Sequence, residues 1–327
     1  MVNLTMVGAI NQGLRRAMES DPQVLLMGED IGKLGGVFRA TEGLQRDFGE
    51  DRVIDTPLAE SGIVGTAIGL ALYGYRPVVE IQFDGFVYPA FDQIIVQMAR
   101  MRYRSGGALR LPITIRMPNG GGIGSVEHHG ESPEAYFAAT PGLRVVACSD
   151  PGDAYWMIQQ AIASDDPVIF LEPKRRYWQK GDLDTGAALS DALPMYKAKV
   201  LVEGSDATLI GYGPTVATSL QAAELAKREG VSLEVIDLRS LSPLDMVTVE
   251  RSVKKTGRAI VVHEASSSGG VGGEIGQCLM QSCFYYLQAP VLRVTGYDTP
   301  YPPSRIEDDY LPDAERILDA VAKSMNY

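Results

Sequence analysis

The sequence predicts an α/β protein of two domains, each built on a mostly parallel sheet covered by helices. Short apolar runs rich in Val, Ile and Leu alternate with segments whose apolar residues have helical spacing. The alternation stops at residues 180–194, which are rich in Gly, Asp, Ala and Ser. A chain of 327 residues is long enough for two domains. We therefore expect a first domain over residues 1–180, a linker over 181–195 and a second domain over 196–327.

The first domain is expected to begin with a helix over residues 5–20, where apolar side chains recur on one stripe. The apolar strands that follow are typical of a parallel sheet buried on both faces. Strands are expected at residues 24–27, 52–54, 78–81, 112–116, 144–147 and 168–171, and further helices at 63–73, 91–103 and 152–164.

The second domain repeats this alternation. Gly213 and Pro214 predict a turn before a helix, and Gly230 is typical of the end of that helix. Right-handed crossovers are expected between its parallel strands. Strands are expected at residues 207–211, 233–238, 259–263 and 291–294, and helices at 215–229, 245–256 and 270–282.

The composition argues against several classes of protein. A net charge of −11 does not suit a nucleic-acid surface, which needs a basic stripe, but it permits docking to a basic protein. No apolar run is long enough to span a bilayer, and no secretory signal is recognisable. The three cysteines have no CxxC spacing and cannot all pair within one chain, which favours a reducing cytoplasm. Three histidines without an HExxH motif do not favour a zinc site.

Glu60 is the leading candidate for chemistry. It lies between the strand at residues 52–54 and the apolar helix at 63–73. A helix that is apolar all round is expected to be buried, and a carboxyl group at its start then has a raised pKa unless it is paired. Such a group can exchange protons with a bound ligand. The alternative is a carboxylate that only caps the exposed N–H groups of the helix.

Two more polar residues follow strands of the first domain. Glu29 comes after the strand at residues 24–27, and Gln82 after that at 78–81. Ligands of open α/β sheets bind beyond the carboxyl ends of the strands, so both residues are expected to meet Glu60 on one rim. The alternative for Glu29 is an ordinary carboxylate of a loop or helix start.

A Gly-rich loop at residues 119–127 precedes His128 and His129. Glycines let the backbone approach a ligand closely. No Gly-Lys-Ser or Gly-Lys-Thr follows, so the loop is expected to line a site rather than to cradle phosphate. Histidine titrates near neutral pH and suits proton transfer there. The alternative is a pair of surface histidines in a mobile loop.

Five segments in order resemble the β subunits of 2-oxoacid dehydrogenase first components (E1). The match runs from about Leu4 to the last helix, and its segments are residues 27–39, 56–69, 80–83, 88–106 and 132–137. The resemblance implies a thiamine-pyrimidine-binding, transketolase-like domain followed by a transketolase C-terminal-like domain. The sequence Ser-Pro-Glu-Ala-Tyr-Phe after His129 favours the branched-chain members, although residues 139–142 depart from their usual His-Cys-Pro-Gly. Pyruvate and acetoin enzymes share the architecture and remain alternatives.

The resemblance also implies roles for single residues around thiamine diphosphate. Glu60 is expected to bond a pyrimidine nitrogen, which favours the imino form of the exocyclic amine that deprotonates the thiazolium carbon. Glu29 is implied to be a second carboxylate near it. Leu58, Gln82 and Phe86 match positions that touch the ring or wall its pocket, and Phe86 stands where many branched-chain members have Tyr.

For His129 the resemblance implies a proton donor or electrostatic support when the acyl group passes to the lipoyl arm. A structural monovalent cation, such as K⁺, is implied to bind through backbone oxygens near the turn after residue 163. The residues concerned are Ile113, Ala161, Ser164 and Asp166.

The chain contains no Gly-Asp-Gly motif, with which thiamine enzymes hold the diphosphate and Mg²⁺. The resemblance therefore implies a separate α subunit that supplies this half of the site in an α₂β₂ heterotetramer. It also implies docking to the lipoyl domain and the peripheral subunit-binding domain of the acyltransferase (E2), with Asp298 and the carboxylate of Tyr327 as contributors. A non-catalytic assembly subunit is the alternative from another class, and a self-sufficient transketolase-like enzyme is disfavoured by the missing motif.

Overall fold

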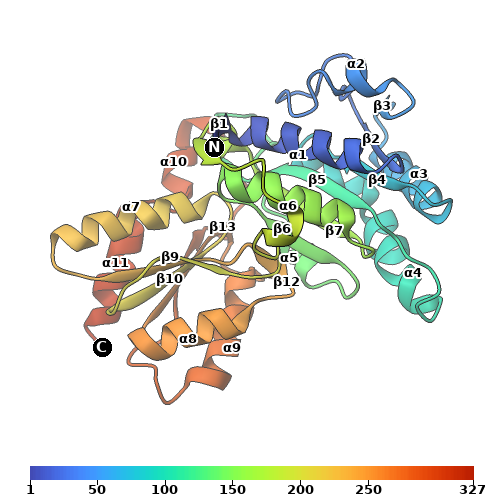
Figure 1. Ribbon diagram of the computed structural model, residues 1–327. Coiled ribbons are helices and arrows are strands. Elements are labelled where there is room, and N and C mark those ends of the chain that lie inside the picture. Colours follow the sequence, from blue (N-terminus) through green and yellow to red (C-terminus); the bar gives the residue numbers. More distant parts are fainter.

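The computed structural model describes residues 1–327 and contains two large sheets with helices packed against them (Figure 1). The strands are β1 Val2–Thr5, β2 Val24–Gly28, β3 Val53–Asp55, β4 Arg76–Glu80, β5 Thr114–Asn119, β6 Arg144–Ala147, β7 Val168–Pro173, β8 Lys180–Leu183, β9 Lys199–Val202, β10 Ala207–Gly211, β11 Leu233–Asp237, β12 Ser240–Ser242, β13 Ala259–Ser266 and β14 Leu292–Gly296. The α-helices are α1 Met6–Ser20, α2 Leu44–Phe48, α3 Glu60–Leu72, α4 Ala99–Arg104, α5 Glu134–Ala138, α6 Pro151–Ala163, α7 Thr215–Arg228, α8 Met246–Thr256, α9 Val271–Cys283, α10 Glu307–Tyr310 and α11 Ala314–Met325.

The first sheet has seven strands in the order β12-β6-β7-β5-β4-β2-β3. All neighbours are parallel except β12, which runs antiparallel to β6 and comes from the second half of the chain. Alternate residues of the strands face opposite helix layers. One layer contains α1 and α6, and the other contains α3 and α5.

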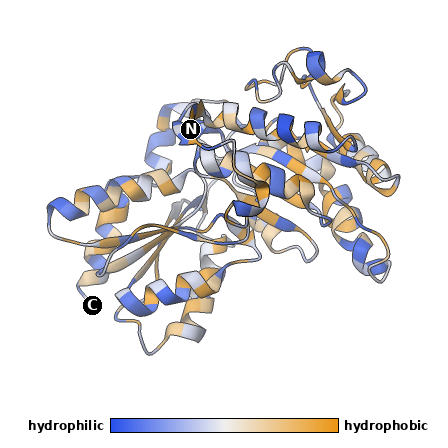
Figure 2. Cartoon of the chain, viewed as in Figure 1, coloured by the Kyte–Doolittle hydropathy of each residue, from blue (hydrophilic) through white to orange (hydrophobic).

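The second sheet has five strands in the order β14-β13-β10-β11-β9, and only β9 is antiparallel to its neighbour. Leu209 and Ile260 face α7 and α11, whereas Ile210 and Val261 face α8 and α9. The colouring by hydropathy shows the same arrangement, with apolar strands inside and polar residues on the outer sides of the helices (Figure 2). The predicted α/β class with two mostly parallel sheets is confirmed.

Local sequence explains the pairing of α1 with α6. The Thr5 side chain accepts a hydrogen bond from the Gly8 N–H at 3.1 Å and so caps the start of α1. A Cβ atom on Gly13 would lie 2.5 Å from the Ile158 side chain and 2.9 Å from the Tyr155 carbonyl oxygen. Gly13 therefore allows the two helices to approach closely over the sheet.

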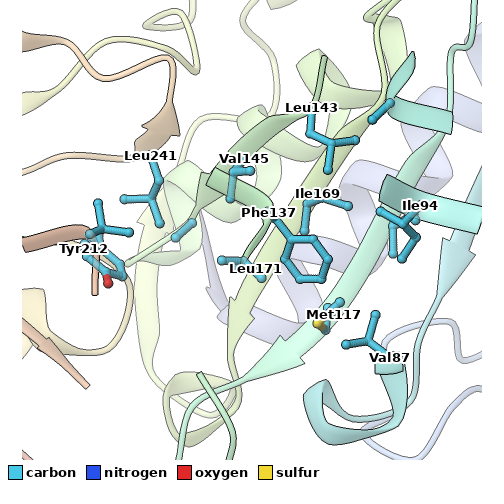
Figure 3. Packing of buried hydrophobic residues seen from close by; sticks show 14 of the residues in the cluster. Val87, Ile94, Met117, Phe137, Leu143, Val145, Ile169, Leu171, Tyr212 and Leu241 are labelled. Carbon is cyan, nitrogen blue, oxygen red and sulfur yellow. The ribbon is translucent and has the colours of Figure 1, made fainter. Parts of the chain in front are cut away.

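One apolar cluster of 36 buried residues joins the two halves of the chain. Figure 3 shows Tyr212 and Leu241 from the second half in one cluster with Val145 and Phe137 from the first. Burial of this shared surface holds the two sheets together, because apolar area removed from water stabilises contact at about 25 cal/mol per Å².

Three local expectations differ from the structure. Residues 180–194 have weak periodicity and are predicted as a linker between the two alternating halves; in the structure they begin with a strand, β8, which pairs antiparallel with β1. The predicted helix at residues 91–103 is a π-helix over Asp92–Met98 that continues as α4. Helix α3 is not buried all round in this chain, since its open side leaves Leu72 and the following Tyr73 46% and 84% exposed.

None of the helices combines the length and apolar character that a bilayer crossing requires. The three cysteines are free, and Cys148 and Cys283 are buried. No group of three or more His, Cys, Asp or Glu side chains is placed to hold a metal ion.

Candidate active site

The candidate site lies at the carboxyl ends of five adjacent parallel strands of the first sheet, β3, β2, β4, β5 and β7. Glu29 follows β2, Gln82 follows β4 and Lys174 follows β7. Glu60 is the first residue of α3, after the turn that follows β3. The topology therefore brings the predicted residues to one rim, because parallel neighbours end at the same edge.

Glu60 and Glu29 form a pair of carboxylates, and each is only 8% exposed. Burial raises the pKa of Glu29, and the neighbouring Glu60 and Asp30 carboxylates raise it further. The buried Thr56 hydroxyl, in the turn before α3, has no hydrogen-bond partner in the chain. This unpaired buried hydroxyl, four residues before Glu60 in the chain, is a candidate hydrogen-bond partner for a bound ligand.

Aromatic rings form the next part of the rim. The His129 ring meets Phe83 and Phe86 edge-on, with centroid distances of 4.4 and 5.0 Å. His129 Nδ1 lies 2.9 Å from the Glu127 carbonyl oxygen, which leaves Nε2 as the nitrogen available for other partners. The structure thus brings His129 and Phe86 together, although they are far apart in sequence.

The other two predicted residues, Gln82 and Leu58, are more exposed than the two carboxylates. The Gln82 amide donates to the Asp30 carboxylate at 3.4 Å, which directs it toward the loop that carries Glu29. Leu58 projects from the turn before α3 and is 79% exposed. Such exposure of a large apolar side chain is compatible with a further molecule covering the rim.

The loop with the two histidines passes directly over Gly85. A Cβ atom at Gly85 would lie 2.0 Å from the His128 carbonyl oxygen, so only glycine leaves room for the loop there. His128 itself has a positive φ of 65°, and its ring lies 3.8 Å from the Glu131 carboxylate. The His129 backbone is held within the loop, because its N–H donates to the Val126 carbonyl oxygen at 3.2 Å and its carbonyl oxygen accepts from the Ser125 hydroxyl at 3.3 Å.

A buried ionic network underlies the rim. Arg116 bridges Glu80 at 2.6 Å and Glu172 at 2.7 and 2.9 Å, and the Tyr177 hydroxyl donates to Glu172 at 2.7 Å. Burial opposes the charge on Arg116, but Glu172 and Glu80 raise its pKa well above the usual range. Each charged group has hydrogen-bonding partners, as a buried network requires.

Asp84 and Lys174 form a second buried pair, with 2.8 Å between Asp84 Oδ2 and Lys174 Nζ. Burial raises the pKa of Asp84 to about 6, although Lys174 and the N–H groups of Gly85 and Gly120 oppose this change. Burial also lowers the pKa of Lys174. Desolvation thus favours the neutral forms of both groups. Asp84 Oδ2 also accepts a hydrogen bond from the Gly120 N–H at 2.8 Å and so fixes the start of the loop that carries the histidines.

Glu134 begins α5 directly after this loop and contacts the second half of the chain. Its Oε1 accepts a hydrogen bond from the Tyr212 hydroxyl at 2.7 Å. Burial raises the pKa of Glu134 to about 7, and the bond from Tyr212 limits that rise. A carboxyl group of this kind titrates near neutral pH at the junction of the two sheets.

The carbonyl groups of the expected cation site all accept hydrogen bonds within the chain. Arg76 Nη1 donates to the Ser164 carbonyl oxygen at 3.1 Å, and the Ser164 hydroxyl donates to the Asp166 backbone carbonyl oxygen at 3.0 Å. The Ile113 and Ala161 oxygens accept from backbone N–H groups at 2.9 and 3.1 Å. A carbonyl oxygen has two lone pairs, so each retains one acceptor position for a cation.

A large cavity lies elsewhere, beside α4 and the turn before β6. Its volume is about 850 Å³, and Arg102, Arg144 and Asp166 are in its wall. Neither Glu29 nor Glu60 lines this cavity.

Comparison with known proteins identifies the family. Residues 3–179 match the model of the transketolase pyrimidine binding domain, and residues 196–317 match that of the transketolase C-terminal domain. The pyruvate dehydrogenase E1 component subunit beta of Leifsonia xyli is 59% identical, over 99% of this chain and 96% of that protein. This chain belongs to the E1 β subunits of 2-oxoacid dehydrogenases. The 3-methyl-2-oxobutanoate dehydrogenase subunit beta of Mycobacterium tuberculosis is 51% identical, over 98% of this chain and 92% of its own length.

A solved structure shows the same fold at lower identity. The split gene transketolase, described as an inactive beta4 tetramer, superposes with a TM-score of 0.80 at 22% identity, covering 99% of this chain and 98% of that one. The resemblance to E1 β subunits stated from the sequence is thus confirmed, as is the transketolase-like fold.

The sequence did not point to several charged residues of this E1 β subunit. Arg116, Glu172 and Lys174 lie in or directly after apolar strands, and Asp84 precedes Gly85 after β4. Charged residues inside otherwise apolar strands are a usable signal, because such groups are rarely buried unless they are paired. The identity of each partner, however, depends on strand order.

Proposed function

We propose that this chain is the β subunit of a thiamine-diphosphate-dependent E1 enzyme that decarboxylates a 2-oxoacid and acylates the lipoyl group of E2. The observation that carries the proposal is the buried Glu60–Glu29 pair at the rim, in a chain closely related to E1 β subunits. The unpaired Thr56 hydroxyl, in the turn that leads to Glu60, supports a bound ligand with polar atoms.

In this proposal Glu60 would form a hydrogen bond with a ring nitrogen of the cofactor. Glu29 is proposed to support Glu60 as a neighbouring carboxylate, and burial together with the charges of Glu60 and Asp30 raises the pKa of Glu29. When bound, thiamine diphosphate supplies the electron sink for decarboxylation. Phe86 provides an apolar wall beside His129, while Leu58 and Gln82 border the ring.

His129 is proposed to donate a proton, or to stabilise negative charge, during transfer of the acyl group to the lipoyl arm. Its ring is fixed by Phe83 and Phe86, and its Nδ1 faces the Glu127 carbonyl oxygen. This arrangement leaves Nε2 to act on a substrate, as a general acid requires.

An α subunit is proposed to complete the site with the residues for diphosphate and Mg²⁺, in an α₂β₂ assembly. The open side of α3 supports this, since a Cβ atom on Gly69 would meet no other atom within 4 Å and Tyr73 is 84% exposed. Leu58 is exposed at the other end of α3, beside the rim. Apolar groups left open in this way favour contact with another chain.

Further contacts of the proposed complex involve ions and E2. A monovalent cation such as K⁺ is proposed at the free lone pairs of the Ile113, Ala161, Ser164 and Asp166 carbonyl oxygens. The acidic second half is proposed to dock the basic subunit-binding domain of E2 in a cytoplasmic complex. Hydrogen bonds from the Ser268 N–H and hydroxyl lower the pKa of Asp298 and keep this carboxylate charged for such a contact.

Branched-chain 2-oxoacids are the first proposed substrates, because the sequence after His129 is similar to the branched-chain members and one relative at 51% identity carries a 3-methyl-2-oxobutanoate name. Pyruvate is the second candidate, because the relative at 59% identity carries a pyruvate dehydrogenase name. The two differ by methyl and methylene groups, which a pocket discriminates by about 1–3 kcal/mol each.

The test is decarboxylation by the chain reconstituted with its α subunit, thiamine diphosphate and Mg²⁺, with an artificial electron acceptor. We expect Glu60→Gln to lower kcat by at least about 100-fold, since it removes a positioned proton carrier, while Glu19→Gln on the exposed side of α1 leaves it unchanged. Higher kcat/KM for 2-oxoisovalerate than for pyruvate would support the first substrate, and the reverse would support the second. Full activity of Glu60→Gln would favour a non-catalytic assembly subunit.

A further inference from the structure

The loop that carries the histidines, residues 119–131, is held by carboxylates from the second half of the chain. Glu307 Oε2 accepts a hydrogen bond from the Gly122 N–H at 3.1 Å, and its Oε1 accepts one from the Gly124 N–H at 2.6 Å. Glu264 Oε2 accepts from the Gly121 N–H at 3.1 Å. Hydrogen bonds to a charged acceptor are about twice as strong as neutral ones, so these carboxylates define the path of the glycine segment.

Tyr301 fills the base of the loop between its two sides. Its hydroxyl donates to Glu307 Oε2 at 2.7 Å and accepts from the Gly122 N–H at 3.0 Å. A Cβ atom on Gly121 would lie 1.8 Å from the Tyr301 hydroxyl oxygen, and one on Gly130 would lie 2.5 Å from the ring. The first and last segments of the loop thus both pack on the Tyr301 ring.

The opposite side of the loop is fixed by the first half of the chain. Asp84 Oδ2 accepts from the Gly120 N–H at 2.8 Å, and the His128 carbonyl lies against Gly85. Glu264 is itself restrained by Arg175, which lies 2.6 Å away. Glu307 is 7% exposed and is the first residue of α10, so it is held by the packing of the second half. The loop therefore spans two rigid supports.

We propose that Glu307 and Tyr301 are positioning residues for His129: they hold the glycine segment so that the imidazole stays against Phe83 and Phe86 at the rim. This rests on the proposed function of His129 in acyl transfer. It gives the second half of the chain a part in the chemistry besides any part in assembly. Glu60 lies on α3, outside this loop, so decarboxylation does not depend on the same contacts.

The experiment uses the complete complex of α subunit, this chain and E2, with Glu307→Gln and Tyr301→Phe as variants. Glu307→Gln replaces one acceptor oxygen by an NH₂ group that cannot accept from the loop, and Tyr301→Phe removes only the hydroxyl. The matched control is Asp308→Asn, which changes the exposed neighbouring carboxylate. Two rates are measured: decarboxylation with an artificial acceptor, and acylation of the lipoyl domain.

We expect Glu307→Gln to slow lipoyl acylation by roughly 10- to 100-fold, the size that a displacement of about 1 Å produces at a reacting group. Decarboxylation should stay within about twofold of wild type, because only a transfer-step interaction is lost. Tyr301→Phe should also slow lipoyl acylation, but by a smaller factor than Glu307→Gln. In the His129→Ala background, Glu307→Gln should cause no further loss, because residues that act as a unit are not additive.

Hydrogen exchange of the peptide covering residues 119–131 gives a readout that needs no turnover. Faster exchange in Glu307→Gln, but not in Asp308→Asn, is expected because the amides of the loop lose their acceptor. Equal loss of both rates, additive effects with His129→Ala, or unchanged exchange would each overturn the positioning role while leaving the proposed function intact. Absence of turnover by the wild-type complex with every 2-oxoacid would instead overturn the proposed function, and the positioning role with it.

Discussion

Glu134→Gln tests whether a buried carboxyl group at the junction of the two sheets makes stability depend on pH. In the folded chain, burial raises the pKa of Glu134 from an ordinary value of 4.5 to about 7. The folded state therefore binds its proton more tightly than the unfolded state does. The stability that this proton provides is fully present below about pH 4.5 and is lost as the pH rises through about 7.

The size of the effect follows from the pKa. The difference between 4.5 and about 7 corresponds to roughly 3 kcal/mol, because each pKa unit is about 1.4 kcal/mol. Glutamine remains neutral, and its oxygen can still accept from the Tyr212 hydroxyl that donates to Glu134 Oε1. Relative to wild type, Glu134→Gln should therefore gain up to about 3 kcal/mol of unfolding free energy between about pH 5 and about pH 8.

The assay is urea unfolding of wild type and variant at one protein concentration and several pH values. Asp237 also has a raised pKa, but it is present in both proteins and is not among the groups that act on Glu134, so its contribution cancels in the difference. Glu19→Gln on the exposed side of α1 is the control and should run parallel to wild type. A constant difference between wild type and Glu134→Gln across this range would refute the reasoning.

Three further outcomes are expected. Arg116→Met leaves two buried carboxylates without their counter-ion and should lower the unfolding free energy by about 3–5 kcal/mol, measured by urea unfolding; a loss below about 1 kcal/mol would contradict a buried network. Gly85→Ala forces the His128 carbonyl away and should slow lipoyl acylation more than decarboxylation. An unchanged ratio of these two rates would count against a close contact between Gly85 and His128. Asp313→Ala removes the cap that accepts from the Arg316 N–H at 2.7 Å and should lower stability by about 1 kcal/mol in thermal unfolding, whereas no change would mean that packing alone defines the start of α11.

Much of the fold could be predicted because apolar periodicity is a local property. The strand over Ala207–Gly211 lies where it was expected, and the rim residues meet because parallel strands end at one edge. The pair of Glu60 and Glu29 could be anticipated for the same reason. Their roles toward a cofactor stay predictions, as do those of Leu58 and Gln82.

Contacts between distant segments could not be predicted in this way. Nothing near Glu134 in the sequence indicates that Tyr212 donates to it, and nothing near the glycine loop indicates that Glu307 accepts from it. These pairs depend on how the two sheets pack. The strand β8 was missed for the same reason. Its apolar pattern is weak, and it forms a strand because it pairs with β1 from the start of the chain.

The place of β12 has a consequence for dissecting this protein into fragments. Ser240–Ser242 belongs to the second half of the chain, yet it closes the edge of the first sheet along β6. A fragment that stops before this strand would present β6 as a bare edge with unpaired backbone groups, which invites strand pairing between copies. Truncations, tags inserted at mid-chain and circular permutations should therefore keep β12 together with β6, even though about 90 residues of the chain separate them.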